Sequence, residues 1–338
     1  MKIILDAMGG DLAPTAPVLG ALEAAKAYGV EITLVGRGES ILEVLGKNGI
    51  DTLPEGIEIA NADDVVDMHD DPATVLHKRK TSSMVIGLKM LADGQGDAFV
   101  SAGSTGALLT GATLLVKRVK GIRRAAMAPA MPNKKGGKTV ILDCGANADC
   151  KPINLQQFAV MGSVYMNQVK GVKQPKVALL SNGTEDAKGN ALTKEAFVLL
   201  KNTPSVNFVG NMEARDILSG EYDVVVTDGF YGNIALKSME GMVSCIFSEL
   251  KTQIYSSFKG KIGGMLLKES FKKVKDRLDY NKKGGALLLG MKKTVVKAHG
   301  SSKAEAFKNA VLQAYECSSL DVSEKISEEI AALSGESV

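Results

Sequence analysis

The chain has 338 residues, of which 45% are hydrophobic and 5% are aromatic, with no tryptophan and a formal net charge of +3. This length and apolar content are sufficient for a large folded core, whereas the low charge and the few aromatic rings argue against nucleic-acid binding. Four cysteines without a C-x-x-C pair and three histidines provide no zinc-binding set, and no apolar run is long enough to span a bilayer.

Strand-like runs alternate with helix-like stretches along the chain. Short apolar runs rich in β-branched residues predict strands at 2–5, 32–35, 98–101, 139–143, 177–181 and 222–227. Helical patterns lie between them, at 14–28, 105–119, 154–169, 190–201 and 233–255. This alternation predicts the α/β fold class with a three-layer α/β/α sandwich. Because no low-complexity linker interrupts it, residues 1–338 are expected to form a single domain.

The first loop, Asp6-Ala7-Met8-Gly9-Gly10-Asp11, follows the first strand and precedes the first helix. Glycines at such a junction let backbone N–H groups face an anion, and the helix N-terminus adds partial positive charge. Asp6 and Asp11 are unusual in a bare phosphate cradle and indicate a site that also positions cations, hydroxyls or water. The spacing differs from the G-x-G-x-x-G fingerprint of dinucleotide sites. Neither an organic cofactor nor a metal is expected.

Four further strand ends carry glycine, amide or hydroxyl residues. They read Ser101-Ala102-Gly103-Ser104-Thr105-Gly106, Asp143-Cys144-Gly145-Ala146-Asn147, Ser181-Asn182-Gly183-Thr184-Glu185 with Lys188, and Asp228-Gly229-Phe230-Tyr231-Gly232-Asn233 with Lys237. Each alone also fits an ordinary turn, or a helix cap in the case of Ser104. Because ligands of open α/β sheets bind along the carboxyl ends of the strands, the loops together predict a shared site for a small anion.

Two clusters add cations and hydroxyls. His77-Lys78-Arg79-Lys80-Thr81-Ser82-Ser83 is basic and then hydroxylic, although a solvated loop with a helix cap has the same pattern. His299-Gly300-Ser301-Ser302 follows a strand-like run, and Ser302 also fits a capping box with Glu305. No Ser-His-Asp or Cys-His set and no G-x-S-x-G elbow is recognisable. In an enzyme of this kind the nucleophile can belong to the substrate, and inorganic phosphate fits that role.

Residues 251–283 differ from the rest of the chain in charge. They contain ten basic and three acidic residues, a net charge of +7, which leaves −4 for the remainder. Leu267, Phe271, Val274 and Leu278 recur on one helical face, after the apolar stretch 262–267. Such a basic amphipathic helix suits an anionic membrane surface or an acidic partner protein. The alternative is a solvated helix that packs its apolar stripe on the core or on a second subunit.

In this order, the motifs closely resemble those of the bacterial phosphate acyltransferases of the PlsX type. The resemblance covers nearly the whole chain up to about Val322, and it includes Ser82-Ser83-Met84, Leu236-Lys237, Gly284-Gly285-Ala286 and Leu288-Leu289-Gly290 besides the loops above. It implies a fold like that of isocitrate and isopropylmalate dehydrogenases, with two intertwined halves around one mixed sheet. It also implies a homodimer and a protruding helical hairpin over 251–283 that contacts the membrane.

The resemblance further implies the reaction. A long-chain acyl group would pass from acyl carrier protein to inorganic phosphate, and the acyl phosphate would supply phosphatidic acid for phospholipid synthesis. The expected partners are acyl carrier protein, a second copy of the chain, an anionic membrane surface and a downstream membrane glycerol-3-phosphate acyltransferase, without nucleic acid. Because Asp6 interrupts the apolar N-terminus, no signal peptide is expected. The predicted location is cytoplasmic, with peripheral attachment to the inner face of the cell membrane.

The candidate site residues form three groups. Charge neutralisation, oxyanion donation and orientation are assigned to the catalytic group Lys80, Asn182, Lys188, Asp228, Asn233, Lys237 and His299. Phosphate or substrate binding is assigned to Asp6, Gly9, Gly10, Asp11, Ser82, Ser83, Ser101, Ser104, Thr105, Gly106, Gly183, Ser301 and Ser302. Membrane contact is expected at Ile262, Met265, Leu266, Leu267, Phe271, Val274 and Leu278.

Three other functions remain open on the residues alone. A CoA-dependent phosphate acetyl- or butyryltransferase would share the phosphate chemistry and the fold family. A β-decarboxylating dehydrogenase would need a nicotinamide site and a set of metal-binding carboxylates that the motifs do not supply. A non-catalytic scaffold for lipid enzymes at a membrane surface would explain the basic segment but would leave the strand-end loops without a purpose.

Overall fold

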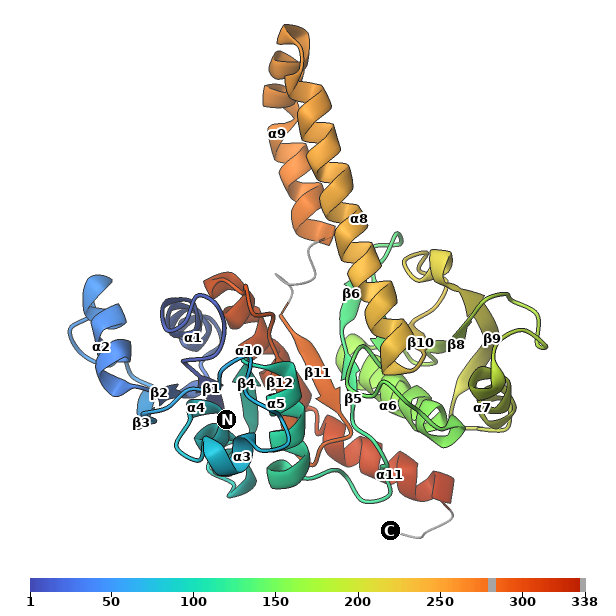
Figure 1. Cartoon of the computed structure of the whole chain (residues 1–338), viewed down its shortest axis with the longest axis horizontal. Coiled ribbons are helices and arrows are strands. Elements are labelled where there is room, and N and C mark those ends of the chain that lie inside the picture. Colours follow the sequence, from blue (N-terminus) through green and yellow to red (C-terminus); the bar gives the residue numbers. More distant parts are fainter. Residues whose placement is uncertain (279–283, 335–338) are drawn as a thin grey trace.

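Two β-sheets and their covering helices build the computed structural model, which describes residues 1–278 and 284–334 (Figure 1). The seven-stranded sheet has the order β3-β2-β1-β4-β12-β11-β5. Its strands are β1 (Lys2–Asp6), β2 (Glu31–Gly36), β3 (Ile57–Asn61), β4 (Ala98–Ser101), β5 (Ala126–Ala128), β11 (Ala286–Leu289) and β12 (Thr294–Lys297). All pairs are parallel except those of β11, which runs antiparallel to β12 and to β5.

The five-stranded sheet has the order β6-β7-β10-β8-β9, with β6 antiparallel and the other strands parallel. It comprises β6 (Ala130–Pro132), β7 (Lys138–Leu142), β8 (Lys176–Ser181), β9 (Asn207–Glu213) and β10 (Val224–Val226). The expectation of one mixed sheet is therefore wrong. Only Pro129 separates β5 from β6, yet the two strands belong to different sheets. Proline has no N–H to continue a ladder, which suits this break.

Helices connect most of the strands. They are α1 (Thr15–Tyr28), α2 (Gly38–Lys47), α3 (Val75–Lys78), α4 (Ser83–Ala92), α5 (Thr105–Gly111), α6 (Pro152–Lys170), α7 (Ala191–Lys201), α8 (Gly229–Tyr255), α9 (Phe258–Leu278), α10 (Ala304–Ser319) and α11 (Val322–Ser334). A π-helix, Ala112–Val116, continues α5, and a short 3₁₀ helix covers Ala214–Asp216. The single helix expected over 105–119 is thus α-helical only in its first half. The predicted α/β class is confirmed.

The layers follow from alternation along the strands. In β1, Ile3 and Leu5 belong to the core cluster that contains α1 and α10, whereas Ile4 belongs to the cluster that contains α4. Successive strand side chains point to opposite faces, so each face of the sheet is covered by its own helices. The seven-stranded sheet is therefore the middle layer of an α/β/α arrangement, as predicted.

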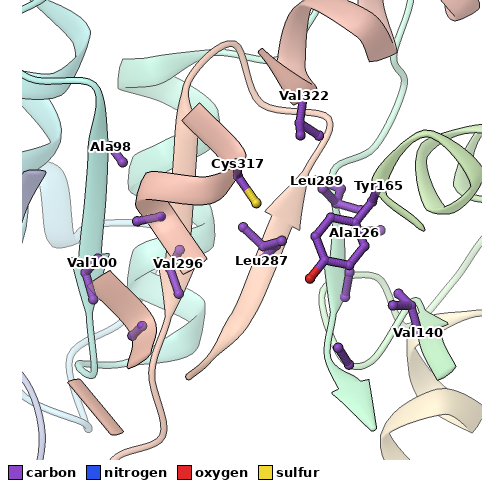
Figure 2. Packing of buried hydrophobic residues seen from close by; sticks show 14 of the residues in the cluster. Ala98, Val100, Ala126, Val140, Tyr165, Leu287, Leu289, Val296, Cys317 and Val322 are labelled. Carbon is purple, nitrogen blue, oxygen red and sulfur yellow. The ribbon is translucent and has the colours of Figure 1, made fainter. Parts of the chain in front are cut away.

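One apolar core extends across both sheets. Figure 2 shows Leu287 and Val296 of the first sheet packed toward Tyr165 of α6 and Val140 of β7 in the second. These side chains are buried and belong to one cluster. The apolar core is thus continuous across the two sheets, which holds the loops of the two sheets in place relative to one another.

Helices α8 and α9 form a pair that projects from the body (Figure 1). The two helices pack side by side: Gly264 of α9 is buried, and a Cβ there would lie 2.5 Å from Cγ2 of Ile254. Helix α8 begins at Gly229, four residues before the predicted start, because the Asp228 side chain accepts a hydrogen bond from the Tyr231 N–H. In the described part of the chain, no helix combines the length and the apolarity needed to cross a membrane.

Candidate functional site

The ends of three neighbouring strands, β1, β4 and β12, meet at one edge of the seven-stranded sheet. The Ser101 hydroxyl donates a 2.7 Å hydrogen bond to the Asp6 carboxylate, and the same hydroxyl accepts one from the Gly103 N–H at 3.0 Å. The Asp11 N–H donates to the Gly300 carbonyl at 2.8 Å. The first loop is therefore tied to the loops after β4 and β12, which confirms that these strand ends share an edge.

Close packing explains the two glycines of the first loop. A Cβ on Gly9 would lie 2.6 Å from Oδ2 of Asp6 and 2.8 Å from the Gly103 nitrogen. Gly10 has a φ of 103°, which L side chains rarely adopt. Their ligand-facing role stays a prediction, since the structure already requires both glycines for contacts between loops.

Asp6 is buried among hydroxyls and backbone donors. Burial raises the pKa of its carboxyl, while hydrogen bonds from the Ser101 hydroxyl and the Met8 N–H act in the opposite direction. Ser83, at the start of α4, also lies beside this carboxylate and acts to lower its pKa. The candidate residues Asp6, Ser83 and Ser101 thus form one polar cluster behind the strand ends.

A cavity of about 300 Å³ lies between the two sheets. Four of the predicted residues line it: Thr105 from α5, Asn233 and Lys237 from α8, and His299 from the loop after β12. The remaining lining residues are Met127, Pro129, Cys144, Gly145, Leu236, Gly284, Gly285, Ala286, Lys297 and Ala298. Loops far apart in the sequence therefore converge on one space, although the first loop and the loop after β8 are not among its described lining residues.

Polar and basic side chains line this cavity. Lys237 forms a 2.9 Å ion pair with Glu240 one helical turn on. Burial lowers the pKa of His299, and the nearby charge of Lys237 lowers it further. The imidazole is accordingly neutral near pH 7, with Nδ1 2.8 Å from the Ser301 hydroxyl. The cavity thus offers a cation and a neutral imidazole beside the Asn233 amide.

Sequence reasoning missed Lys297, the last residue of β12. Its side chain is buried and lines the cavity. Burial lowers the pKa of its ammonium group to about 8, although Asp6 and Asp11 act to raise it. The sequence shows only a lysine at the end of an apolar strand, so its burial depends on the neighbouring strand β4 and could not be anticipated.

Asp143 was noted as a strand end but not as the organiser of its loop. Its Oδ1 accepts hydrogen bonds from the Met127 and Ala146 N–H groups at 2.8 and 3.1 Å. Its Oδ2 accepts two more from Asn147, at 2.6 Å from the backbone and 2.9 Å from the side chain. Burial raises the pKa of this carboxyl, and the four donors oppose that effect. The carboxylate therefore fixes the loop against which α8 begins.

Other predicted residues line a second cavity, which has a volume of about 410 Å³. Asn182 and Asp228 line it together with Leu180, Ser181, Gly189, Asn190, Thr193, Ala214, Thr227, Tyr231 and Ala235. The Asn182 side-chain oxygen accepts the Gly189 N–H at 2.9 Å, and Asp228 caps α8. Burial raises the pKa of Asp228. The predicted catalytic group is thus divided between two cavities on different sides of the first turns of α8.

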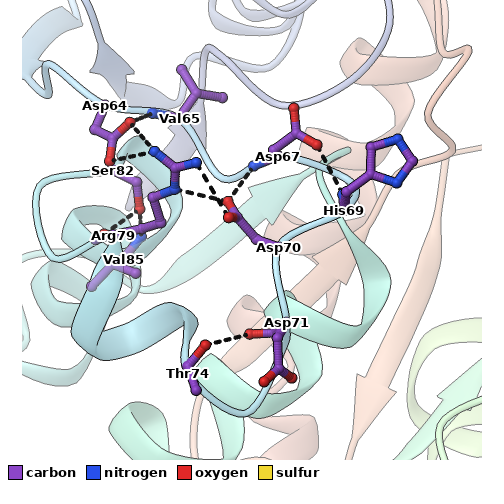
Figure 3. A network of polar contacts seen from close by, with 10 residues as sticks. All are labelled: Asp64, Val65, Asp67, His69, Asp70, Asp71, Thr74, Arg79, Ser82 and Val85. Atoms are coloured by element: carbon purple, nitrogen blue, oxygen red, sulfur yellow. Dashed lines mark hydrogen bonds and ion pairs between the residues drawn. The ribbon is translucent and has the colours of Figure 1, made fainter.

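The basic cluster after residue 77 is already paired in part. Figure 3 shows Arg79 between Asp64 and Asp70, with its Nε 2.8 Å from Asp70 and its Nη1 3.2 Å from Asp64. The Ser82 hydroxyl caps α4 by accepting the Val85 N–H at 3.4 Å. Lys80 is exposed, as is Lys188 near Gly183 in the loop after β8. Neither lysine is among the described residues that line the two cavities.

The helix caps that Ser104 and Ser302 offered as alternatives to ligand binding do not form. The hydroxyl of Ser104 makes no capping bond to α5. Ser302 does not cap α10 either, because Lys303 occupies the cap position and has no side-chain capping bond. Ser302 is buried, whereas Ser301 reaches the His299 ring. The hydroxyl of Ser104 and the backbone of Gly106 therefore remain candidates for a ligand rather than structural caps.

The predicted membrane residues differ in exposure along α9. Met265 and Leu266 are 74% and 80% exposed, and Ile262, Leu267 and Val274 are also exposed. Phe271 and Leu278 are half-buried instead. The part of the basic segment that falls on 279–283 lies outside the described residues. The exposed apolar side chains are thus concentrated in the first half of α9, at the far end of the helical pair (Figure 1).

Comparisons with known proteins identify the family from sequence and show the same fold in more distant solved structures. The model of the family described as "Fatty acid synthesis protein" matches residues 1–325. Phosphate acyltransferases of Bacillus thuringiensis (strain Al Hakam) and Bacillus cereus (strain AH187) are 48% identical over 328 residues, which is 97% of this chain and 97% of theirs. A phosphotransacetylase from Streptococcus pyogenes shares the fold with a TM-score of 0.62 at 19% identity, over 96% of this chain and 94% of that one. EutD phosphotransacetylase from Staphylococcus aureus also shares the fold, with a TM-score of 0.59 at 18% identity, over 96% of this chain and 94% of that one. The chain therefore belongs to the fatty acid synthesis protein family, the family of the phosphate acyltransferases that its motifs resemble.

Proposed function

We propose that this protein transfers a long-chain acyl group from the thioester of acyl carrier protein to inorganic phosphate, which yields acyl phosphate for phospholipid synthesis. The cavity between the sheets carries this proposal, because Lys237, Lys297 and His299 line it together with Asn233 and Thr105. Preorganised cations and hydrogen-bond donors in a partly enclosed space suit an anionic nucleophile. Membership of the family and relatives named phosphate acyltransferase support the same reaction.

The proposed chemistry needs no nucleophile from the chain. A phosphate oxygen attacks the thioester carbonyl, an O–C bond forms, and the tetrahedral oxyanion takes hydrogen bonds from the donors of the cavity. The C–S bond then breaks and its electron pair leaves on the thiolate, which needs little help from an acid. The Asn233 amide and the His299 ring are the candidate oxyanion donors, and Lys237 offsets the phosphate charge. Lys80, Asn182 and Lys188 lie outside this cavity, and their predicted roles remain proposals.

The partners follow from the same chemistry. Acyl phosphate is amphiphilic, so delivery at a membrane surface suits it, and the α8–α9 pair, whose second helix is rich in lysine, projects from the body (Figure 1). We accordingly propose peripheral attachment to an anionic cytoplasmic membrane face. A downstream glycerol-3-phosphate acyltransferase and a homodimer are proposed on the resemblance to the family alone. The single core that crosses both sheets supports a single domain of two intertwined halves.

The direct test is acyl transfer by the purified full chain. Palmitoyl-acyl carrier protein and inorganic phosphate are supplied, acyl phosphate is trapped by hydroxylamine as the hydroxamate, and the free thiol is titrated. We expect hydroxamate and thiol in equal amounts, both dependent on phosphate. Absence of phosphate-dependent product would contradict the proposal.

A CoA-dependent phosphate acetyl- or butyryltransferase is the alternative, and its support is the fold shared with the phosphotransacetylases. Acetyl-CoA and butyryl-CoA replace the carrier-protein substrate in the same assay. Preference for the short CoA esters, measured as kcat/KM, would favour the alternative over the proposed function.

A further inference from the structure

Lys297 occupies the end of β12, where the two sheets face each other across the 300 Å³ cavity. Its side chain is only 9% exposed, whereas Lys80 and Lys188 lie on the surface. Resting on the proposed function, we infer that the Lys297 ammonium group binds the phosphate substrate directly and is its main cationic ligand. Phosphate binding is thereby assigned to a lysine at the end of a strand and not to Lys80 or Lys188, which lie in surface loops.

The hydrogen bonds of Lys297 leave room for a ligand. Its Nζ donates to the carbonyl of Ala102 at 3.3 Å and to that of Ala298. A lysine ammonium has three donors, and in the described residues these two carbonyls are its hydrogen-bond acceptors. The carbonyls hold the ammonium at a fixed place on the cavity wall. One N–H therefore remains for an oxygen atom in the cavity.

The charge of Lys297 also lacks a close partner. Asp6 and Asp11 act on it electrostatically, but in the part of the chain that the structure describes no carboxylate lies within ion-pair distance of its Nζ. A buried ammonium without an ion pair is costly, and an anion in the cavity would remove that cost. Lys237 also lines the cavity, but Glu240 already pairs with it, so its contribution to offsetting the phosphate charge is secondary to that of Lys297.

Burial makes this interaction stronger than one at the surface. Water screens the charges of Lys80 and Lys188, whereas the low polarity around Lys297 lets its charge act on a ligand with little screening. An ammonium bound to one phosphate oxygen leaves another oxygen free to attack the thioester carbonyl. Lys297 would thus hold the phosphate in place for attack, while taking no part in the bonds that form and break.

The test compares substitutions of Lys297 with a matched control. Lys297→Met removes the charge and keeps the length, Lys297→Gln keeps a neutral donor, and Lys297→Arg keeps the charge. Lys292→Met, at an exposed position just before the same strand, is the control. Circular dichroism checks folding, and the Gln variant decides the outcome if the Met variant does not fold.

Two readouts separate this inference from the proposed function. Calorimetric titration measures the Kd of inorganic phosphate without an acyl donor, and steady-state kinetics give the KM of phosphate and of the acyl donor separately. Loss of one charge-assisted hydrogen bond should raise the Kd and KM of phosphate roughly 10- to 100-fold in Lys297→Met, with partial recovery in Lys297→Arg. The KM of the acyl donor should stay unchanged in these variants, and the control variant should keep the wild-type values of both Kd and KM.

Unchanged phosphate Kd and KM in the Met and Gln variants would overturn the inference. A wild-type protein that binds phosphate but makes no acyl phosphate would overturn only the proposed function.

Discussion

The hydroxyl of Ser101 donates a 2.7 Å hydrogen bond to the carboxylate of Asp6, although 95 positions separate the two residues in the chain. The bond joins the ends of β1 and β4, which are neighbours in the seven-stranded sheet. Because the Asp6 side chain is 1% exposed, its charge depends on donors of this kind. The bond therefore ties the first loop to the end of β4, where Ser101 pairs with Lys297, a residue that lines the cavity.

Ser101→Ala is expected to destabilise the protein by about 1–3 kcal/mol, since it removes a donor from a buried carboxylate. Ser104→Ala is the control, because the Ser104 hydroxyl is also buried but does not cap α5. Urea unfolding followed by circular dichroism measures both. Equal stability of the two variants would show that the Ser101–Asp6 bond contributes little.

The start of α8 offers a second test, because the helix approaches the loop after β7 very closely. A Cβ on Gly232 would lie 1.9 Å from the Asp143 carbonyl oxygen, whereas Gly241, farther along the same helix, has nothing within 4 Å. Alanine normally stabilises a helix by about 1 kcal/mol relative to glycine. We expect Gly241→Ala to raise the melting temperature and Gly232→Ala to lower it and to reduce activity. A rise in both variants would contradict the close packing of α8 against this loop.

The sequence was sufficient to predict several parts of the site, because their signals are local. Glycines and hydroxyls at strand ends indicated a shared site, and the structure brings Thr105, Asn233, Lys237 and His299 together around one cavity, whose ligand stays a prediction. The sequence could not predict which strands flank β12, because β12 lies between β4 and β11 in the sheet although it follows β4 by almost 200 residues in the chain. The burial of Lys297 depends on that insertion.

The division into two sheets was missed for a related reason. The sequence shows which strands are apolar but not which strands pair, and β5 and β6 are adjacent in the chain while belonging to different sheets. Asn182 and Asp228 consequently line a second cavity, away from His299. The alternative in which Ser104 and Ser302 serve as helix caps does not apply either, because Ser104 occupies the N-cap position of α5 without a side-chain bond and Lys303 occupies that of α10.

Phosphate binding should depend on pH through Lys297. Its pKa is lowered by burial to about 8, while the carboxylates of Asp6 and Asp11 act to raise it and Lys237 acts to lower it. The ammonium is therefore charged below about pH 8 and loses its proton above it, so the KM of phosphate should rise as the pH increases from 7 to 9.5. His299, whose pKa is lowered, stays neutral throughout this range. In Lys297→Arg the rise should disappear, because arginine stays protonated. A wild-type KM that is constant over this range would contradict the assignment.

The α8–α9 pair gives the last test, which concerns membrane attachment. Leu266 and Met265 are the most exposed of the predicted contact residues in α9, and the basic residues of the pair favour an anionic surface. Leu266→Glu combined with Met265→Glu should abolish flotation with vesicles that contain phosphatidylglycerol, because it places two charges where apolar side chains would enter the lipid. Val198→Glu is the control, since Val198 is 58% exposed on α7, outside the pair. Phe271→Glu should instead lower stability, as its side chain is half-buried. Flotation that is equal in the double variant and the control would exclude membrane contact through α9 and would favour a protein partner on the same apolar face.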